Sequence, residues 1–187
     1  MRRLLVFNLV SIDGYFVDVN GDMSWAHAGD QEFKEFAQGN ARGGGELLFG
    51  RVTYDLMARY WPTPAARQND PVVAEAMNSL PKVVFSRTMK KAAWTNTRVM
   101  NGDPAGSVRK MKEEPGPGMA IMGSGTIIPI LAQEGLIDEY QLVVVPVVLG
   151  GGRTIFDGVK SRPRVKLTKS RVFGNGYVLL CYEPVSI

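Results

Sequence analysis

The sequence predicts an α/β protein with a mostly parallel central sheet, helices on both faces of that sheet, and an antiparallel hairpin at its C-terminal edge. Apolar, β-branched runs of strand length alternate with segments of helical spacing, which is the order that builds parallel sheets. The early runs are continuously apolar rather than alternating, as expected of strands that are covered on both faces. Near the end, Gly174-Asn175-Gly176 separates two β-rich segments, which is typical of a hairpin turn.

Each expected strand is bounded by turn residues or by a helical pattern. In chain order the expected strands are Leu4–Val10, Glu46–Gly50, Lys82–Ser86, Arg98–Met100, Met119–Met122, Glu139–Val148, Val165–Val172 and Gly176–Glu183. The last two form the hairpin, and helices are expected to connect most of the others.

The first two helices are expected before and after the second strand. Asp30 is the expected N-cap of the first, in which Phe33, Phe36 and Ala37 recur at helical spacing. The second is expected over Thr53–Tyr60, which carries apolar residues at similar spacing.

Two further helices are expected in the second half of the chain. Asp103-Pro104 combines a capping residue with proline in the first turn, and Gly135 is the expected C-cap of a helix over Gly125–Gln133. The segment Trp61–Leu80, rich in Pro, Ala, Asn and Asp, is expected to be an excursion loop.

Length and composition predict one globular domain over residues 1–187, in which 45% of residues are hydrophobic and 21% charged. The net charge of +4 suits an anionic ligand, but it is modest and shows no interleaving of aromatic and basic residues, so a nucleic-acid partner is not expected. No stretch approaches transmembrane length, so no membrane partner is expected either. The single cysteine, Cys181, excludes an internal disulfide and favours a reducing, cytoplasmic compartment, with the thiol buried in a strand. With one histidine, His27, and no Cys or His cluster, no metal site is expected.

The expected strands end on small, hydroxylated and basic residues. Gly50-Arg51-Val52-Thr53, Ser86-Arg87-Thr88 and Gly123-Ser124-Gly125-Thr126 each follow an apolar run. Ligands of open α/β sheets bind at the carboxyl ends of parallel strands, and helix N-termini and arginines there bind phosphate. The sequence lacks the G-x-G-x-x-G and Walker A patterns. A nicotinamide dinucleotide, if bound, must therefore be held by a different fold.

The chain resembles the dihydrofolate reductase-like superfamily, and within it the reductase of riboflavin biosynthesis in a stand-alone form. The matching segments run in family order across residues 3–183. They are Ser11-Ile12-Asp13-Gly14-Tyr15, Phe49-Gly50-Arg51-Val52-Thr53-Tyr54, Lys82-Val83-Val84-Phe85-Ser86-Arg87-Thr88, Met122-Gly123-Ser124-Gly125, and Ile137-Asp138-Glu139 leading to Pro146–Gly152. The resemblance implies the three-layer fold of that superfamily and NADPH as the hydride donor.

The resemblance also implies which residues would bind NADPH. Arg51 and Arg87 would favour NADPH over NADH, although a surface salt bridge is the alternative role of each. The residues implied at the pyrophosphate and the 2′-phosphate are Gly50, Arg51, Thr53, Gly123, Ser124, Gly125 and Thr126; those at the adenosine end are Ser86, Arg87 and Thr88; those beside the nicotinamide are Leu9, Asp13 and Gly14.

Fewer residues are implied at the substrate. Met23, Trp25 and Asp30 resemble the loop tryptophan and helix carboxylate of the folate enzymes, so Asp30 is the catalytic candidate, with the helix N-cap as its alternative role. Gly151, in the triple glycine, is the remaining substrate candidate, with a plain loop as its alternative. His27 is expected at the surface, and a proton relay is its alternative.

The leading hypothesis is an NADPH-dependent reductase of the 5-amino-6-(5-phosphoribosylamino)uracil reductase type, acting on a small ribosyl-pyrimidine-like compound. One alternative is a dihydrofolate or other pterin reductase, in which Asp30 would be essential. Another is a non-catalytic NADP-binding protein. A homodimer that pairs through the apolar C-terminal strands is expected.

Overall fold

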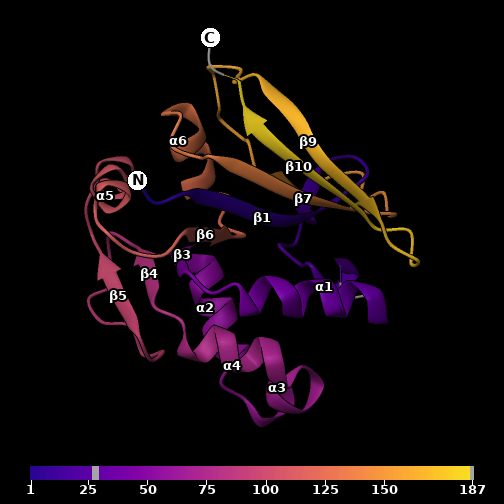
Figure 1. The fold of residues 1–187 in the computed structure, drawn as a ribbon, viewed down its shortest axis with the longest axis horizontal. Helices are drawn as coiled ribbons and strands as arrows, with labels where there is room; N and C mark the ends of the chain where they lie inside the picture. Colours follow the sequence, from indigo (N-terminus) through magenta and orange to yellow (C-terminus); the bar gives the residue numbers. More distant parts are fainter. Residues whose placement is uncertain (27–29, 186–187) are drawn as a thin grey trace.

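The computed structural model describes residues 1–26 and 30–185. Its centre is an eight-stranded sheet with the strand order β5-β4-β3-β6-β1-β7-β10-β9 (Figure 1). The strands from β5 to β7 pair in parallel, whereas β10 is antiparallel to both β7 and β9. The mostly parallel sheet with an antiparallel C-terminal hairpin is thus confirmed.

The expected strands are all present, with small differences at their ends. The main sheet consists of β1 (Leu4–Ser11), β3 (Glu46–Gly50), β4 (Lys82–Phe85), β5 (Thr97–Met100), β6 (Met119–Met122), β7 (Glu139–Val145), β9 (Val165–Val172) and β10 (Val178–Pro184). A separate two-stranded sheet, which the sequence did not reveal, pairs β2 (Tyr15–Val17) with β8 (Arg153–Thr154).

Helices cover both faces of the main sheet. They are α1 (Gln31–Arg42), α2 (Arg51–Tyr60), α3 (Pro64–Asn69), α4 (Pro71–Ser79), α5 (Pro104–Glu113) and α6 (Ile127–Gln133), with a 3₁₀ turn at Ser24–Ala26. Helices α5 and α6 lie on one face, and α1 to α4 lie on the other (Figure 1). Three predicted helix ends are confirmed: Asp30 and Asp103 are N-caps, and Gly135 has a φ of 64° just after α6.

The expectation of a loop over Trp61–Leu80 was wrong, because this segment contains α3 and α4. Thr63 caps α3 by accepting from the N–H of Ala66, and Asp70 caps α4 in the same way. A proline occupies the first turn of each helix, where its missing N–H costs nothing. The prolines that suggested a loop are therefore helix starts.

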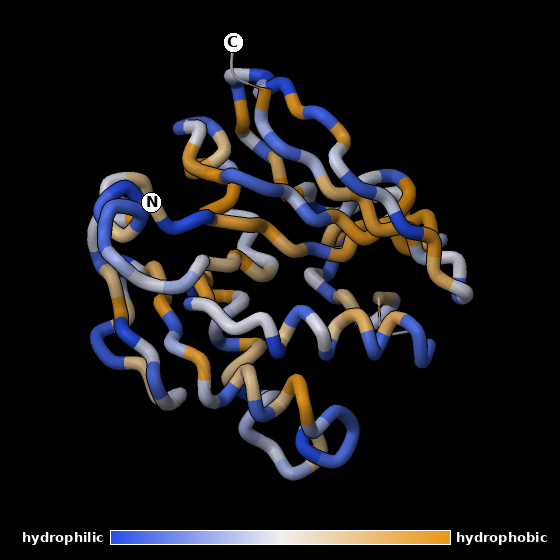
Figure 2. Tube along the Cα trace, in the orientation of Figure 1, coloured by the Kyte–Doolittle hydropathy of each residue, from blue (hydrophilic) through white to orange (hydrophobic). Residues whose placement is uncertain are grey.

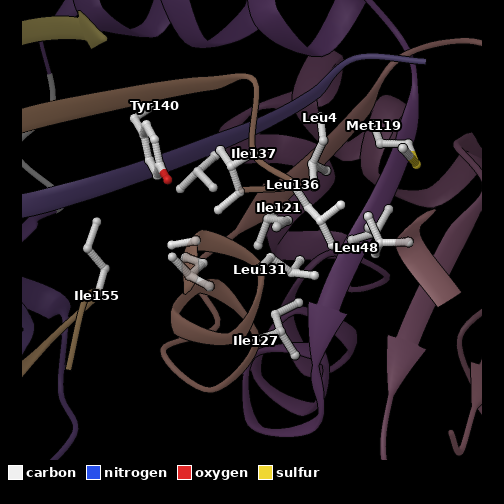
Figure 3. Close-up of a cluster of buried hydrophobic side chains, with 14 of the residues drawn as sticks. Leu4, Leu48, Met119, Ile121, Ile127, Leu131, Leu136, Ile137, Tyr140 and Ile155 are labelled. Atoms are coloured by element: carbon white, nitrogen blue, oxygen red, sulfur yellow. The ribbon is translucent and has the colours of Figure 1, made fainter. Parts of the chain in front are cut away.

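The hydrophobic core is divided by the sheet. On the α5 and α6 face, Leu4, Ile121, Leu131 and other apolar side chains form the cluster shown in Figure 3. On the opposite face, Phe49, Tyr54 and other apolar residues from α2, α4 and the strands pack around Trp94, whereas Phe33 and Phe36 of α1 pack beneath β7 and β10. Figure 2 shows hydrophobic residues along the central strands, hydrophilic residues in many loops, and the two kinds alternating along the helices.

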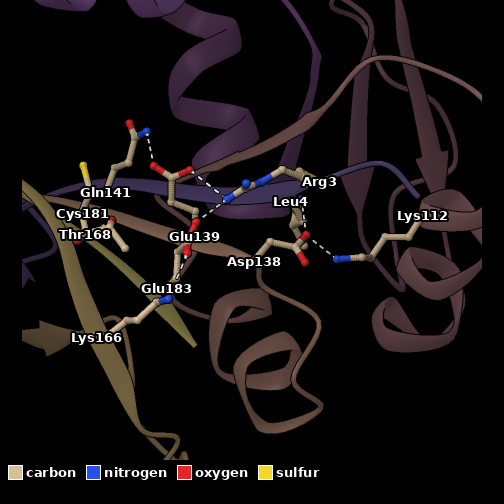
Figure 4. Close-up of polar contacts among 10 residues, drawn as sticks. All are labelled: Arg3, Leu4, Lys112, Asp138, Glu139, Gln141, Lys166, Thr168, Cys181 and Glu183. Carbon is tan, nitrogen blue, oxygen red and sulfur yellow. Dashed lines mark hydrogen bonds and ion pairs between the residues drawn. The ribbon is translucent and has the colours of Figure 1, made fainter. Parts of the chain in front are cut away.

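Polar contacts tie the amino ends of the strands together (Figure 4). The Asp138 carboxylate accepts from the Leu4 N–H at 2.7 Å and pairs with Lys112, which also donates to a backbone carbonyl. Nearby, Glu46 bridges Arg2 at 2.8 Å and Arg98 at 3.0 Å, and the Arg2–Glu46 pair is buried. These charged residues lie at the opposite end of the strands from the predicted ligand site.

Two buried titratable groups fit structural roles. Cys181 is buried and unpaired in β10, as predicted, and its burial raises the pKa of the thiol. Lys82 begins β4, and its ammonium donates to the carbonyls of Met77, Asn78 and Leu80 at the end of α4. Burial lowers the pKa of Lys82 to about 8. Trp94 lies over the same ammonium at 4.5 Å.

Candidate functional site

The carboxyl ends of β3, β6 and β1 lie side by side in the sheet, and a cavity of about 170 Å³ opens there. Several residues predicted at the ligand site line this cavity: Leu9, Met23, Gly50, Thr53, Gly123, Ser124, Gly125 and Thr126. The turns after β3 and β6, which lie more than 70 residues apart in the sequence, therefore meet at one place, as the strand-end argument predicts.

Hydrogen bonds join the turn after β3 to the turn after β6. The N–H of Gly50 donates to Ser124 Oγ at 2.8 Å, and the N–H of Ser124 donates to Thr53 Oγ1 at 2.9 Å. Ser124 is buried and has a φ of 73°, which is unusual for a residue with a side chain. The polar groups predicted to meet phosphate thus also hold the two turns against each other.

The glycines of these turns allow the close approach. A Cβ on Gly50 would lie 2.8 Å from Thr126 Oγ1, and a Cβ on Gly123 would lie 2.9 Å from Thr53 Cγ2. Gly123 also has a φ of 62°, which favours glycine. Packing between the turns therefore accounts for these glycines whether or not a ligand is bound.

Helix α2 begins directly at the site. Its N-cap, Gly50, has no side chain to cap the first-turn N–H groups, so the positive end of the helix faces this edge of the sheet. Arg51 is exposed at the first helical position and forms an ion pair with Asp55 at 3.4 Å. It does not line the cavity, whereas its chain neighbours Gly50 and Val52 do.

The Ser86-Arg87-Thr88 turn lies at the same edge of the sheet, one strand further out, because β4 pairs with β3. Ser86 Oγ accepts from the N–H groups of Thr88 and Met89, and Arg87 is exposed. The turn does not line the cavity, so it can reach only a ligand that extends along the rim.

Asp13 organises a neighbouring loop. Its carboxylate accepts from Ser11 Oγ at 2.6 Å and from the N–H groups of Gly150 and Leu149 at 2.7 and 3.2 Å, and these bonds lower the pKa of the carboxyl. Gly14, Gly151 and Asp13 do not line the cavity. A structural role therefore explains Asp13, and its predicted contact with the nicotinamide stays a prediction.

Of the predicted substrate residues, only Met23 lines the cavity. Trp25 donates its ring N–H to the Asp22 carbonyl and packs against the cluster under β7 and β10. The Asp30 carboxylate accepts from the Phe33 N–H at 3.3 Å, as an N-cap does. His27 lies outside the described residues. The catalytic role of Asp30 stays a prediction.

Several cavity residues were not anticipated from the sequence. Two of them are polar. Asn8 lies on β1, and Arg153, on β8, donates a hydrogen bond of 3.5 Å to the Gly125 carbonyl. The remainder are mainly apolar: Phe7, Phe16, Val17, Gly21, Val52, Leu56, Met57 and Met122. Side chains alternate between the two faces of a strand, so Phe7 and Leu9 of β1 lie on the same face. This alternation is the sequence feature that could have predicted part of the apolar wall.

A larger cavity of about 590 Å³ lies beneath the sheet, between its strands and helices α1 and α4. It reaches the amino ends of the strands at Arg3 and Glu139, and it shares Phe7 and Met122 with the smaller one. Ligands of open α/β sheets bind at the opposite, carboxyl ends. The smaller cavity is therefore the candidate site.

A family model described as "RibD C-terminal domain" matches residues 2–179. The chain belongs to the RibD C-terminal domain family. This finding confirms the resemblance to riboflavin-biosynthesis reductases. Among curated proteins, YyaP of Bacillus subtilis (strain 168) is 30% identical over 187 residues, which cover 97% of this chain and 95% of YyaP. YwjB of the same organism is 23% identical, covering 95% of this chain and 96% of YwjB.

Solved structures with low sequence identity share the fold. A protein from Shewanella sp. PV-4 that is named for riboflavin biosynthesis superposes with a TM-score of 0.72 at 23% identity, covering 98% of this chain and 99% of that one. A deaminase/5-amino-6-(5-phosphoribosylamino)uracil reductase from Thermotoga maritima superposes with a TM-score of 0.66 at 13% identity, covering 98% of this chain and 57% of that one. The RibD-like three-layer fold is thereby established.

No helix among residues 1–26 and 30–185 is long and apolar enough to cross a membrane. Over the same residues, no group of three or more His, Cys, Asp or Glu side chains has the arrangement of a metal site.

Proposed function

We propose that this RibD C-terminal domain protein is an NADPH-dependent reductase of a small ribosyl-pyrimidine-like compound. The observation that carries the proposal is the convergence of Gly50–Thr53 and Gly123–Thr126 on one cavity at the carboxyl edge of the sheet. The similar Thermotoga maritima protein is named for a 5-amino-6-(5-phosphoribosylamino)uracil reductase, which supports this substrate class.

The phosphates of NADPH fit the start of α2. Uncapped N–H groups and the helix dipole, equivalent to roughly half a positive charge, favour an anion there. Arg51 adds a guanidinium at the rim, and the exposed Arg87 adds a second one beyond β4. We assign the pyrophosphate to the α2 start and the 2′-phosphate to Arg51 and Arg87.

The nicotinamide fits the cavity itself. Its volume of about 170 Å³ is below the roughly 300–1,000 Å³ of pockets that hold whole ligands, so only the ring end of a dinucleotide enters. Phe7, Leu9 and Met122 make most of this part apolar, which excludes water from the reacting carbons. When bound, NADPH supplies a hydride to an electrophilic carbon of the substrate.

Asp30 is the proposed proton donor for the reduced substrate. Because Asp30 also caps α1, a test must separate the two roles. Asn caps helices as well as Asp does, but it has no acidic proton. We expect Asp30→Asn to keep the unfolding midpoint of the parent and to lose most of its turnover. Unchanged turnover would leave Asp30 with the capping role alone.

The test of cofactor binding is titration calorimetry with NADPH and NADH. We expect the parent to bind NADPH more tightly, and Arg51→Ala and Arg87→Ala each to weaken NADPH about tenfold without affecting NADH. Arg59→Ala is the matched control, because Arg59 is exposed at the far end of the same helix. Equal affinity for both cofactors in the parent would refute the assignment of the 2′-phosphate.

Turnover separates the proposed substrate from the alternatives. We expect NADPH oxidation with 5-amino-6-(5-phosphoribosylamino)uracil and none with dihydrofolate. Oxidation with dihydrofolate alone would favour a pterin reductase. Binding of NADPH without turnover on any pyrimidine or pterin would indicate a non-catalytic NADP-binding protein.

We further propose a homodimer through the β9–β10 hairpin. All of β9 is exposed, including Leu167 and Val172, and cross-strand pairing places these two residues beside the half-buried Tyr182 and Val178 of β10. An exposed apolar face of this kind at a sheet edge suits a second copy of the chain. Light scattering should give a dimer for the parent and a monomer for Leu167→Lys. A monomeric parent would refute the proposal.

A further inference from the structure

Asn8 has a buried amide group whose hydrogen bonds are only half satisfied. It lies on β1 with 4% of its surface exposed. Its Oδ1 accepts from the N–H of Gly123 at 2.7 Å. Its Nδ2 is buried and has no hydrogen-bond partner among the described residues.

An apolar residue is expected at this position. Val6 and Val10, two residues to either side, point to the same face and are buried. Asn is disfavoured in strands, and an unpaired buried donor costs about 1–3 kcal/mol. A hydroxyl could accept from Gly123 without adding an amide N–H₂ group. The Nδ2 group of Asn8 therefore needs a partner that the described part of the chain does not supply.

The position of Asn8 indicates that the partner is a ligand. Asn8 lines the same cavity as Leu9 and the Gly123–Thr126 turn. Asn175 also has an unpartnered buried amide nitrogen, but it lies in the β9–β10 turn and does not line this cavity. Asn8 thus has an unpartnered donor and also lines a cavity that a ligand can enter.

The surroundings indicate a neutral acceptor rather than a phosphate. Phe16, Val17 and Met23 line the cavity and pack with the apolar cluster that contains Val6 and Val10, on the same face of the sheet as Asn8. Phosphate is better served by the α2 start and by the arginines at the rim. A neutral amide donor among apolar side chains pairs best with a carbonyl oxygen.

We propose that Asn8 orients the nicotinamide by donating a hydrogen bond from Nδ2 to the carboxamide oxygen of NADPH. The inference rests on the proposed function, because it requires NADPH in this cavity. The same amide then links two tasks: Oδ1 holds the Gly123 turn, and Nδ2 fixes the ring that faces the substrate. Which face of the ring is presented to the substrate depends on this bond.

The test compares NADPH with 2′-phospho-ADP-ribose, which has the same phosphates but lacks the nicotinamide. Asn8→Asp keeps an oxygen for the Gly123 N–H and replaces the donor with a second acceptor. We expect this variant to bind NADPH at least tenfold more weakly than the parent does. Its affinity for 2′-phospho-ADP-ribose should stay within about twofold, because no bond to the fragment is lost.

Asn8→Leu is the second variant, since a buried carboxylate at this position can prevent folding. Leucine matches the apolar pattern of β1, so we expect Asn8→Leu to fold. Because leucine also removes the oxygen that holds the Gly123 turn, we expect both ligands to bind more weakly, with the loss for NADPH about fivefold larger than the loss for the fragment. Thermal unfolding of each variant shows whether it is folded.

Three results would overturn the proposal in different ways. Unchanged NADPH affinity in a folded Asn8 variant would exclude the bond to the carboxamide. Equal weakening of NADPH and 2′-phospho-ADP-ribose would show that Asn8 acts through the Gly123 turn alone. If the parent binds NADPH no more tightly than it binds the fragment, the nicotinamide ring does not occupy the cavity. A parent that binds neither ligand would instead refute the proposed function itself.

Discussion

Ser124 is the residue that most directly holds the two turns of the site together, and Ser124→Ala tests this role. The substitution removes the oxygen that accepts from the Gly50 N–H at 2.8 Å, and that bond is buried. The backbone strain is unchanged, because alanine and serine are similarly strained at a φ of 73°. The loss is therefore that of one partner for a buried N–H, about 1–3 kcal/mol in the free energy of unfolding.

For a protein of this length, such a loss lowers the unfolding midpoint by about 2–4 °C per kcal/mol, so a decrease of about 4–8 °C is expected for a loss of about 2 kcal/mol. Differential scanning calorimetry measures it, with Ser161→Ala as the control because Ser161 is exposed. NADPH affinity should fall as well, since the Gly50 turn carries the start of α2. A midpoint within about 1 °C of the parent would show that the bond between the turns contributes little, and the reasoning about the site would be wrong.

The remaining predictions concern stability and its pH dependence. Glu46→Gln should lower the free energy of unfolding, measured by urea titration, by about 3–5 kcal/mol, because it leaves the buried Arg2 without its counter-charge. Glu75→Gln is the control, since Glu75 is exposed, and an equally small loss for both variants would contradict this prediction. Lys82→Met should cost about 2 kcal/mol, because carbonyls at the end of α4 lose their donor, and an unchanged urea midpoint would exclude this capping role. The pKa of Asp13 is lowered in the folded state, so its charged form stabilises the fold above the ordinary carboxyl pKa of about 4, and this stabilisation disappears as the pH falls through the lower folded-state pKa. The parent should therefore exceed Asp13→Asn in unfolding midpoint at pH 6 and lose that advantage in strong acid; a difference that does not vary with pH would refute the assignment.

The sheet could be predicted from the sequence because most of its strands are apolar, β-branched runs that end at turn residues or at a helical pattern. The same reasoning failed where elements are short or use ambiguous residues. In the sequence, Pro64 and Pro71 favour a loop, but proline is also common in the first turn of a helix, which is where both residues lie. The strands of the small sheet, β2 and β8, have three and two residues, too few for a periodic pattern.

The candidate site was predicted only in part, for a similar physical reason. Gly50 and Gly123 follow recognisable strands, so their convergence follows from the topology of a parallel sheet. Asn8 lies in the middle of an apolar strand, and its half-satisfied amide becomes visible only when the Gly123 N–H is found against it. The hydrogen bond that ties Asp13 to Gly150 crosses 137 residues of sequence, which no local pattern reveals.

The most direct test of the account is a crystal structure of the protein with NADPH bound. The account predicts the pyrophosphate at the start of α2, between the Gly50 and Gly123 turns, with the nicotinamide in the cavity beside Asn8. Density for the nicotinamide in the larger cavity beneath the sheet, or a pyrophosphate away from α2, would contradict it.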